Sequence, residues 1–334
     1  MLFYSHIVLN LRCGCNVILG TMTHKRIHYF HDDLVTRYGC RVQKLCIEGG
    51  FTCPNRDGTK AYGGCLFCDA GGSGAAHINS SLKIREQVQE QKRRCVARYG
   101  AVKFISYFQS YTNTYAPLDH LRKLYDEAVE DPDVIGLSVG TRADCLSEEI
   151  CALLAKYKDS GRRVWVEIGI QTVNQSTLDK LNRAESVEDF VRAGQLVKQA
   201  GLELVTHVIV GLPGDTLQDF LATIDLVNFL QADGIKIHNL YIDSRAPLAQ
   251  MWREMKVPTL SLENYVSAVC DGLERLSWGC LVHRLSGQAP RPYHLAPDWA
   301  LDKQKVMAAI EGELEHRGTR QGYREFSLSL RSIS

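Results

Sequence analysis

The chain has 334 residues, of which 45% are hydrophobic and 23% are charged. This composition excludes fibrous, collagen-like and wholly disordered chains. Thirty-nine Lys and Arg against 38 Asp and Glu give a net charge of +1, so no global field draws the chain to nucleic acid or membranes. The longest run without a charged residue, 104–118, is shorter than the ~18 apolar residues of a membrane span and includes polar ones.

Twelve cysteines are spread along the chain without the framework of a small disulfide scaffold. This predicts thiols and metal ligands in a reducing, cytoplasmic compartment. The first 21 residues are apolar, but their Arg follows the hydrophobic part and no A-x-A-like site is present, which is atypical of a signal peptide. We expect residues 1–27 to be a leader that is disordered or not native, with Met22 as the true start.

From residue 43 to 241, short apolar runs alternate with amphipathic stretches, as in successive βα units around a parallel sheet. The predicted strands are 43–51, 102–108, 134–140, 163–170, 202–211 and 233–242. The predicted helices are 79–98, 117–130, 147–159, 186–200, 216–231, 261–275 and 299–315. Ser147, followed by two Glu residues, suits a helix start because Ser caps free N–H groups and acidic side chains favour that end of the dipole.

Six βα-type units predict an α/β fold in which the sheet curls into a partial (β/α)6 TIM-like barrel, with its chemistry at the carboxyl ends of the strands. The alternative is an open doubly wound sheet, but no GxGxxG motif follows the first strand. We expect the barrel core over residues 28–250 and a C-terminal helical extension packed on it over 251–325. Residues 326–334 are expected to form a flexible tail.

Directly after the first predicted strand, Cys53, Cys65 and Cys68 form a C-x11-C-x2-C arrangement in a glycine-rich loop. Three thiolates in one loop indicate a metal. A structural zinc site requires a fourth ligand. The candidates for that ligand are Cys40, Cys46 and His77. An iron–sulfur cluster with three protein thiolates instead leaves one iron open to an exogenous ligand, and the spacing alone leaves both interpretations open.

The CLFC tetrad, with Phe67 before its last cysteine, and its place after strand one resemble the radical S-adenosylmethionine (SAM) superfamily. Ordered strings including GFTCPNRDGTKAYGGCLFC, HVIVGLPGDT and HRLSGQAPR resemble the YhcC-type subfamily, which is related to the catalytic subunit of Elongator. The resemblance spans about residues 28–325. The first cysteine gap is longer than the superfamily's usual C-x3-C-x2-C, but long gaps are typical of the Elongator-related branch.

The resemblance implies that Cys53, Cys65 and Cys68 bind three irons of a 4Fe-4S cluster, with SAM chelating the fourth iron. Reductive cleavage of SAM would give a 5′-deoxyadenosyl radical that abstracts hydrogen from a substrate, as in an oxidoreductase or a transferase. An external electron donor such as flavodoxin or ferredoxin would be required. The alternative is a zinc-stabilised binding module without redox chemistry.

The resemblance also implies cofactor contacts at the first strand ends. Phe67 would pack near the cluster and the adenine. Gln109 and Thr114, after the second strand, are candidates for the methionyl amine, because their neutral groups can hydrogen-bond it. Ser138 or Thr141, at the end of the third strand, is a candidate for the ribose hydroxyls.

Further contacts follow from the fourth and fifth strands. Gln171 and Arg183 resemble residues that bind polar groups of SAM, and the fork of Arg183 matches the methionyl carboxylate. Ile209 precedes a GLPG turn that resembles the superfamily's adenine-side motif.

Candidate catalytic residues lie on the fourth and sixth strands. Glu167 alternates with apolar residues, and a buried carboxylate is costly unless it has a partner, which favours a site residue. Lys236 and Tyr241 are the candidates on the sixth strand. The strand period places Lys236 with His238 and Tyr241 with Asn239, and the sequence does not fix which face lines the site.

The relation to Elongator's catalytic subunit implies RNA, such as a tRNA base, as a substrate. Residues 83–98 carry six Lys or Arg against two Glu, a basic helix in a neutral chain. A solvated helix face explains the same residues, and no RNA-binding motif with interleaved stacking aromatics is visible. A small metabolite or a protein therefore stays open as the substrate.

Overall fold

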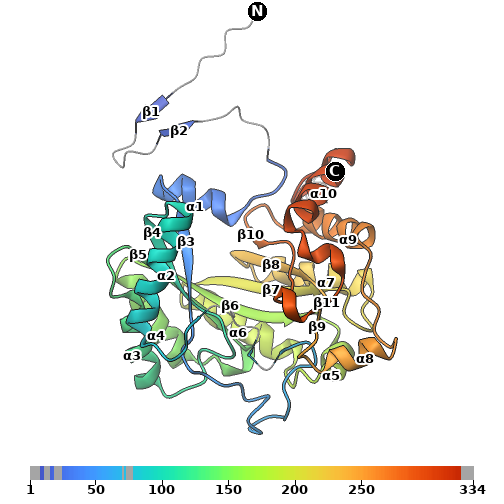
Figure 1. Ribbon diagram of the computed structural model, residues 1–334, viewed down its shortest axis with the longest axis horizontal. Coiled ribbons are helices and arrows are strands. Elements are labelled where there is room, and N and C mark those ends of the chain that lie inside the picture. Colours follow the sequence, from blue (N-terminus) through green and yellow to red (C-terminus); the bar gives the residue numbers. More distant parts are fainter. Residues whose placement is uncertain (1–7, 11–15, 19–24, 70, 73–77, 325–334) are drawn as a thin grey trace, which may run out of the picture.

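The computed structural model describes residues 8–10, 16–18, 25–69, 71–72 and 78–324. Its centre is a seven-stranded parallel sheet in the order β10-β8-β7-β6-β5-β4-β3, curled into a half-barrel (Figure 1). The strands are β3 (Val42–Ile47), β4 (Lys103–Phe108), β5 (Val134–Thr141), β6 (Arg163–Gln171), β7 (Glu203–Val210), β8 (Gly234–Asn239) and β10 (Leu281–Arg284). The predicted curled parallel sheet is confirmed, with one more strand than the six predicted.

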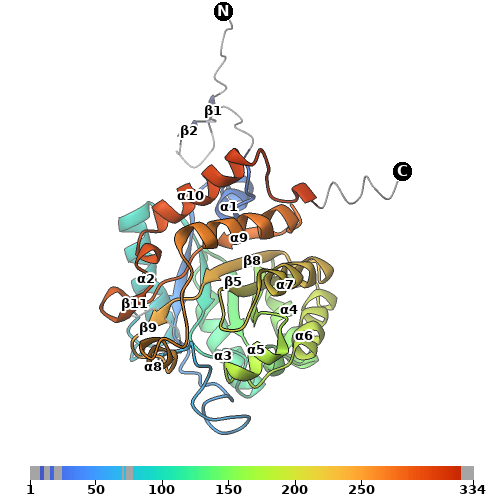
Figure 2. The same ribbon diagram turned by 90° about the vertical axis from the view of Figure 1, so that its right-hand side faces the viewer.

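Amphipathic helices cover the outer face of the sheet, and α9 packs beside α7 and α10 beside α9 (Figure 2). The long helices are α2 (Ile84–Tyr99), α3 (Leu118–Val129), α4 (Glu148–Asp159), α6 (Val187–Gln199), α7 (Leu217–Phe229), α9 (Leu262–Arg275) and α10 (Lys303–His316). Two shorter ones are α5 (Gln175–Lys180) and α8 (Leu248–Arg253). The Ser147 side chain accepts a hydrogen bond from the Ile150 N–H, which confirms the predicted helix start.

Two strand ends and one additional strand are among the differences from the sequence prediction. The first strand ends at Ile47 and not at 51, because Gly50 takes a left-handed conformation (φ 73°) that breaks the extended chain. The sixth ends at Asn239, and β9 (Ile242–Asp243) then pairs antiparallel with β11 (His294–Ala296). The seventh strand, β10, follows α9 and pairs parallel with β8.

Helix α1 (Phe30–Tyr38) closes the amino-terminal end of the half-barrel, where it contacts both edge strands, β3 and β10. Phe30 and Leu34 are buried in one apolar cluster with residues of the strands, including Trp165 and Leu281. The Phe30 ring meets the Trp165 ring edge-on, with centroids 5.5 Å apart. The barrel interior is therefore closed at this end, and the space for chemistry lies toward the carboxyl ends of the strands.

Alternate residues of each strand have opposite environments. Leu45, Phe104 and Val166 are completely buried between the sheet and its helices. Their neighbours Lys44 and Glu167 face the barrel interior and contact one another there. This alternation is what a twisted sheet covered on one side by helices requires.

Strands β1 (Val8–Asn10) and β2 (Asn16–Ile18) form a two-stranded antiparallel sheet. The remaining predicted leader up to residue 24, with Met22, and the predicted tail at 326–334 lie outside the described residues. Among the helices that are described, none combines the length and the apolar character that crossing a membrane requires.

Candidate active site

The three motif cysteines line one pocket of about 170 Å³ at the carboxyl end of the sheet. Asn55, completely buried, fixes the loop that carries them: its amide donates to the Asn182 carbonyl (2.5 Å) and to the Cys65 sulfur (3.5 Å). Arg56 donates to the Cys68 carbonyl at 3.3 Å. The loop is thus tied both to itself and to the segment after α5.

The donor set of this pocket fits a cluster held by three thiolates. The guanidinium of Arg183 donates a hydrogen bond to the Cys65 sulfur at 3.7 Å. Within the described chain, no three His, Cys, Asp or Glu side chains gather closely enough to hold a single metal ion. Cys40 precedes β3 at the opposite end of the barrel, and Cys46 donates to Gln109. His77 lies outside the described residues.

Two predicted SAM contacts, Arg183 and Gln171, line the cysteine pocket. Arg183 is 7% exposed; it donates to the Gly169 carbonyl (2.7 Å) and pairs with Glu185 (2.7 Å), while its Nε is buried without a partner among the described residues. Gln171 ends β6 with φ 69°, a conformation that costs energy for a non-glycine residue. Strain of this kind and an unsatisfied buried donor are typical of a binding site.

Three other predicted cofactor contacts also lie here. Gln109 and Phe67 line the cysteine pocket, and Phe67 lines a second cavity of about 150 Å³ together with Ile209 and Tyr241. Phe67, Gln171 and His207 are common to both spaces, so the two are neighbours. An elongated molecule can therefore reach from the cysteines to Ile209.

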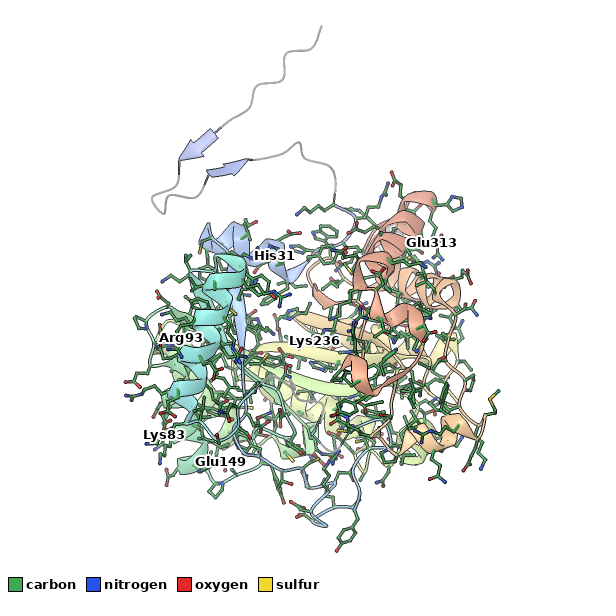
Figure 3. The ribbon with its side chains drawn as sticks, in the orientation of Figure 1. His31, Lys83, Arg93, Glu149, Lys236 and Glu313 are labelled. Atoms are coloured by element: carbon green, nitrogen blue, oxygen red, sulfur yellow. The ribbon has the colours of Figure 1, made fainter. Side chains whose placement is uncertain are left out.

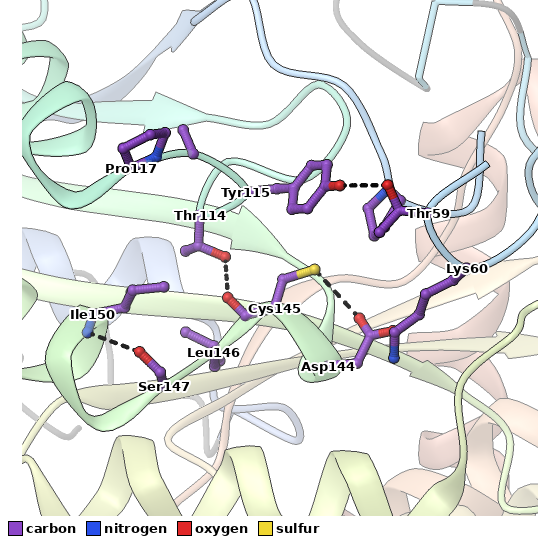
Figure 4. A pocket seen from close by; sticks show the side chains of 12 residues that line it. Thr59, Lys60, Thr114, Tyr115, Pro117, Asp144, Cys145, Leu146, Ser147 and Ile150 are labelled. Carbon is purple, nitrogen blue, oxygen red and sulfur yellow. Dashed lines mark hydrogen bonds and ion pairs between the residues drawn. The ribbon is translucent and has the colours of Figure 1, made fainter. Parts of the chain in front are cut away.

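The structure does not bring Thr114 and Ser138 to the cysteine pocket. Thr114 lines a separate hollow of about 570 Å³. Its hydroxyl forms one hydrogen bond with the Thr141 hydroxyl (2.6 Å) and donates another to the Cys145 carbonyl (2.6 Å), and Figure 4 shows the second of these bonds. Ser138 lies deeper in the barrel, and its hydroxyl donates to Glu167 at 2.6 Å. The sequence places both residues near the correct strand ends but does not fix the direction of their side chains.

Glu167, 1% exposed, is the centre of a polar cluster inside the barrel. Its carboxylate has five partners, each on a different strand: Lys44 (2.6 Å), Tyr107 (2.9 Å), Ser138 (2.6 Å), His207 (2.8 Å) and Lys236. Burial raises the pKa of Glu167, but the charges of Lys236 and Lys44 outweigh it and hold that pKa well below its usual range. Glu167 is therefore an anion that two lysines share.

Lys236 and His238 are the residues of β8 that face this interior. Lys236 lies at the centre of the molecule (Figure 3), and burial lowers its pKa to about 7 despite the neighbouring Glu167. Asn239, on the opposite face, accepts a hydrogen bond from the Gly287 N–H at 2.9 Å. Tyr241 lies beyond the strand end and lines the second cavity. The candidates Glu167 and Lys236 are therefore in contact, and Tyr241 lies apart from them.

The sequence prediction missed Lys44 and Tyr107 and assigned His207 no partner. Lys44 stands among apolar residues of the first strand, as Glu167 does in the fourth. A second charged residue in a buried strand could have predicted that Lys44 pairs with Glu167, because two buried charges of opposite sign are usually partners.

Residues 52–227 match the radical SAM superfamily, and residues 232–316 match the radical SAM C-terminal domain. This chain belongs to the radical SAM superfamily. It is a radical SAM enzyme, and the enzymes of this family bind a 4Fe-4S cluster and SAM. The resemblance found in the sequence is confirmed.

Two relatives match almost the whole chain, and a third matches part of it. An uncharacterized protein of Bacillus subtilis, YtqA, is 37% identical over 90% of this chain and 93% of its own length. The YhcC protein of Escherichia coli K12 is 38% identical over 88% of this chain and 94% of its own length. A tRNA uridine(34) acetyltransferase of Methanocaldococcus jannaschii is 31% identical over 36% of this chain and 22% of its own length.

Among solved structures, the archaeal Elp3 of Methanocaldococcus infernus shares the fold, with a TM-score of 0.65 and 17% identity. The match covers 84% of this chain and 64% of the Elp3 chain.

Proposed function

We propose that this enzyme cleaves SAM reductively and uses the 5′-deoxyadenosyl radical to abstract hydrogen from a substrate bound inside the barrel. The observation that carries the proposal is that Cys53, Cys65, Cys68, Gln171 and Arg183 line one pocket. When bound, the cluster and SAM together supply the reducing electron and the radical. The barrel wall excludes water from that radical.

In this proposal the chain's own residues bind and orient SAM. The Arg183 fork holds the methionyl carboxylate, Gln109 and Gln171 contact the polar groups, and Phe67 and Ile209 enclose the adenine. Thr114 and Ser138 do not contact SAM themselves but orient residues that line the pocket, because Thr114 bonds to Thr141 and Ser138 bonds to Glu167.

Glu167, Lys236 and Tyr241 are the proposed substrate-side groups. Glu167 lines the cysteine pocket, and Tyr241 lines the adjoining cavity. Lys236, with its lowered pKa, can exchange a proton near neutral pH. Flavodoxin or ferredoxin is the proposed electron donor, and a cytoplasmic location stays a prediction.

Anaerobic reconstitution with iron and sulfide tests the function. We expect a brown protein with iron and sulfide in near-equal amounts, bleached by dithionite, that forms 5′-deoxyadenosine from SAM. A protein that instead takes up stoichiometric zinc and has no visible chromophore would support the zinc-stabilised binding module.

Cysteine variants sharpen this test. Cys53→Ala, Cys65→Ala and Cys68→Ala should each abolish cluster binding and 5′-deoxyadenosine formation, because each removes an iron ligand. Cys270→Ala is the control, since that buried thiol donates only to the Ile310 carbonyl among the described residues. If Cys46→Ala removed the metal as completely, a four-thiolate site would replace the proposed one.

A tRNA substrate is a second candidate, supported by the likeness to a tRNA uridine(34) acetyltransferase. Much of the basic charge of α2 is neutralised, since Arg85, Lys92 and Arg94 all form ion pairs with carboxylates. Arg93, on the outer face of α2 (Figure 3), is exposed and has no ion pair among the described residues.

The salt dependence of tRNA binding tests this candidate. If α2 contacts tRNA, affinity should fall steeply as salt rises, and Arg93→Glu should weaken binding more than the control Arg192→Glu on α6. Undetectable tRNA binding at low salt would exclude it.

A further inference from the structure

The barrel interior carries more positive than negative charge. Lys44 and Lys236 are both paired with the single carboxylate of Glu167. A third cation, Arg284 of β10, is exposed and makes no side-chain hydrogen bond or ion pair with any residue that the structure describes. The interior and its edge thus hold three cationic side chains against one carboxylate.

The position of Arg284 directs its charge into the barrel. The register between β10 and β8 shifts after Val282, and this shift pairs Arg284 with Lys236. Paired residues of parallel strands lie side by side on one face, and the Lys236 side chain faces the interior. Burial lowers the pKa of Lys236, and the charges of Lys44 and Arg284 lower it further. Arg284 therefore acts on the same space as the two lysines.

The histidines around these cations include one that is neutral and two with ring nitrogens that have no hydrogen-bond partner among the described residues. Burial lowers the pKa of His207 to about 4, so this residue is uncharged at neutral pH. The Nε2 atom of His238 and both ring nitrogens of His283 are buried without a hydrogen-bond partner among the described residues. Buried polar atoms without partners are rare in native proteins and indicate a missing ligand or water.

The segment that carries Arg284 packs against residues that line the second cavity. The Gly287 N–H donates to Asn239, and a Cβ at Gly287 would lie 2.7 Å from His238 Nδ1 and 3.2 Å from the Tyr241 ring. Only glycine allows this close approach. The HRLSG string thus places Arg284 three residues before a glycine that lies against His238 and Tyr241 of this cavity.

We propose that the barrel interior binds an anionic group of a small substrate, a carboxylate or a phosphate, through Arg284, Lys236 and Lys44. An anion there would offset the surplus positive charge, and the Arg284 fork can bind such a group bidentately. Helix α1 closes the barrel end below, so the group would enter from the carboxyl ends of the strands, where the cavities of about 170 and 150 Å³ suit a small molecule. This inference rests on the proposed function.

Isothermal titration calorimetry on the reconstituted enzyme, with inorganic phosphate and with acetate as probes, tests the proposal. We expect one equivalent of at least one probe to bind at low ionic strength. Arg284→Gln should weaken this binding about tenfold or more, because it removes a charge-assisted hydrogen bond. The matched control is Arg253→Gln on α8, an exposed arginine that likewise has no ion pair among the described residues.

Lys236→Met is a second variant and should also weaken binding about tenfold or more. Binding of phosphate alone would indicate a phosphorylated substrate, and binding of acetate alone a carboxylic acid. Failure of both probes to bind, or unchanged affinity in Arg284→Gln, would overturn the proposal.

The two proposals fail separately. An enzyme that forms 5′-deoxyadenosine but binds neither anion refutes this inference and leaves the proposed function intact. An enzyme that binds the anion through Arg284 but forms no 5′-deoxyadenosine refutes the proposed function. Stimulation of 5′-deoxyadenosine formation by tRNA, equal in the wild type and Arg284→Gln, would overturn the small-anion assignment.

Discussion

Arg183 reaches the cysteine pocket from the segment after α5, where its ion pair with Glu185 orients it. We predict that Arg183→Ala weakens SAM binding about tenfold to a hundredfold, because a charge-assisted hydrogen bond contributes about 1.5–3 kcal/mol. Gln171→Ala removes a neutral hydrogen bond and should weaken binding about two- to tenfold. Equilibrium SAM binding on protein of unchanged iron content measures both.

Arg192→Ala is the control for Arg183, since that exposed arginine pairs only with Asp189 on the surface of α6. SAM affinity equal to that of the wild type in both variants would leave Arg183 and Gln171 with structural roles alone.

Lys236 gives a prediction on pH. Its pKa is about 7 in the folded chain, because of burial, against 10.5 when exposed. Between these values the unfolded chain holds a proton that the folded chain has lost, so stability rises with pH by at most about 1.4 kcal/mol per unit. The cost of burying the protonated Lys236 is full below pH 7 and absent above the pKa of this lysine in the unfolded chain. Urea unfolding at pH 7, 8 and 9 should show this slope in the wild type relative to Lys236→Met, and parallel curves would contradict it.

The site residues that the sequence could predict are those that belong to a local motif, because residues near them in the chain indicate their role. Cys53, Cys65 and Cys68 share one loop and one motif. Lys44 and Tyr107 could not be assigned in this way, because only the successive pairing of β3, β4, β5 and β6 in the curled sheet brings them to Glu167. A strand's period gives two faces, and tertiary packing decides which of them lines the barrel.

At the level of elements, α1 closes the amino-terminal end of the barrel, and loss of its packing should lower the free energy of unfolding. Phe30 stacks on His283 with centroids 3.9 Å apart and packs edge-on against Trp165. We predict that Phe30→Ala lowers the free energy of unfolding by about 3–5 kcal/mol, through lost burial and the cavity left behind. Urea denaturation measures this loss. Val96→Ala on α2, 47% exposed, is the control and should change stability by less than about 0.5 kcal/mol.

The six predicted strands were found because each is a continuous apolar run between turn or helix patterns. Strand β10 was missed because it is four residues long and half of it is His and Arg. It becomes a strand only because the edge of β8 is available to pair with it. Helix α1 was missed for a similar reason, since only Phe30 and Leu34 of its nine residues are buried.

At the scale of the whole molecule, residues from opposite ends of the described chain meet at the closed end of the barrel. The Gln321 N–H donates to the Arg26 carbonyl at 2.8 Å, and its side-chain oxygen accepts from the His28 N–H at 3.0 Å. Its side-chain nitrogen donates to the Ser277 and Cys280 carbonyls, each at 2.7 Å. One side chain thus joins the entry to α1, the end of α9 and the entry to β10.

Gln321 is 1% exposed, so removal of its amide leaves buried groups that water cannot reach. Each unsatisfied buried group costs about 1–3 kcal/mol, and we predict that Gln321→Ala lowers the free energy of unfolding by about 2–5 kcal/mol in a single transition. Gln250→Ala is the control, because that exposed amide bonds only to Glu254. Urea unfolding followed by both circular dichroism and tryptophan fluorescence measures the loss. A separate early transition in Gln321→Ala would show that the two ends fold independently of the barrel, because cooperative unfolding requires that their contacts be lost together with it.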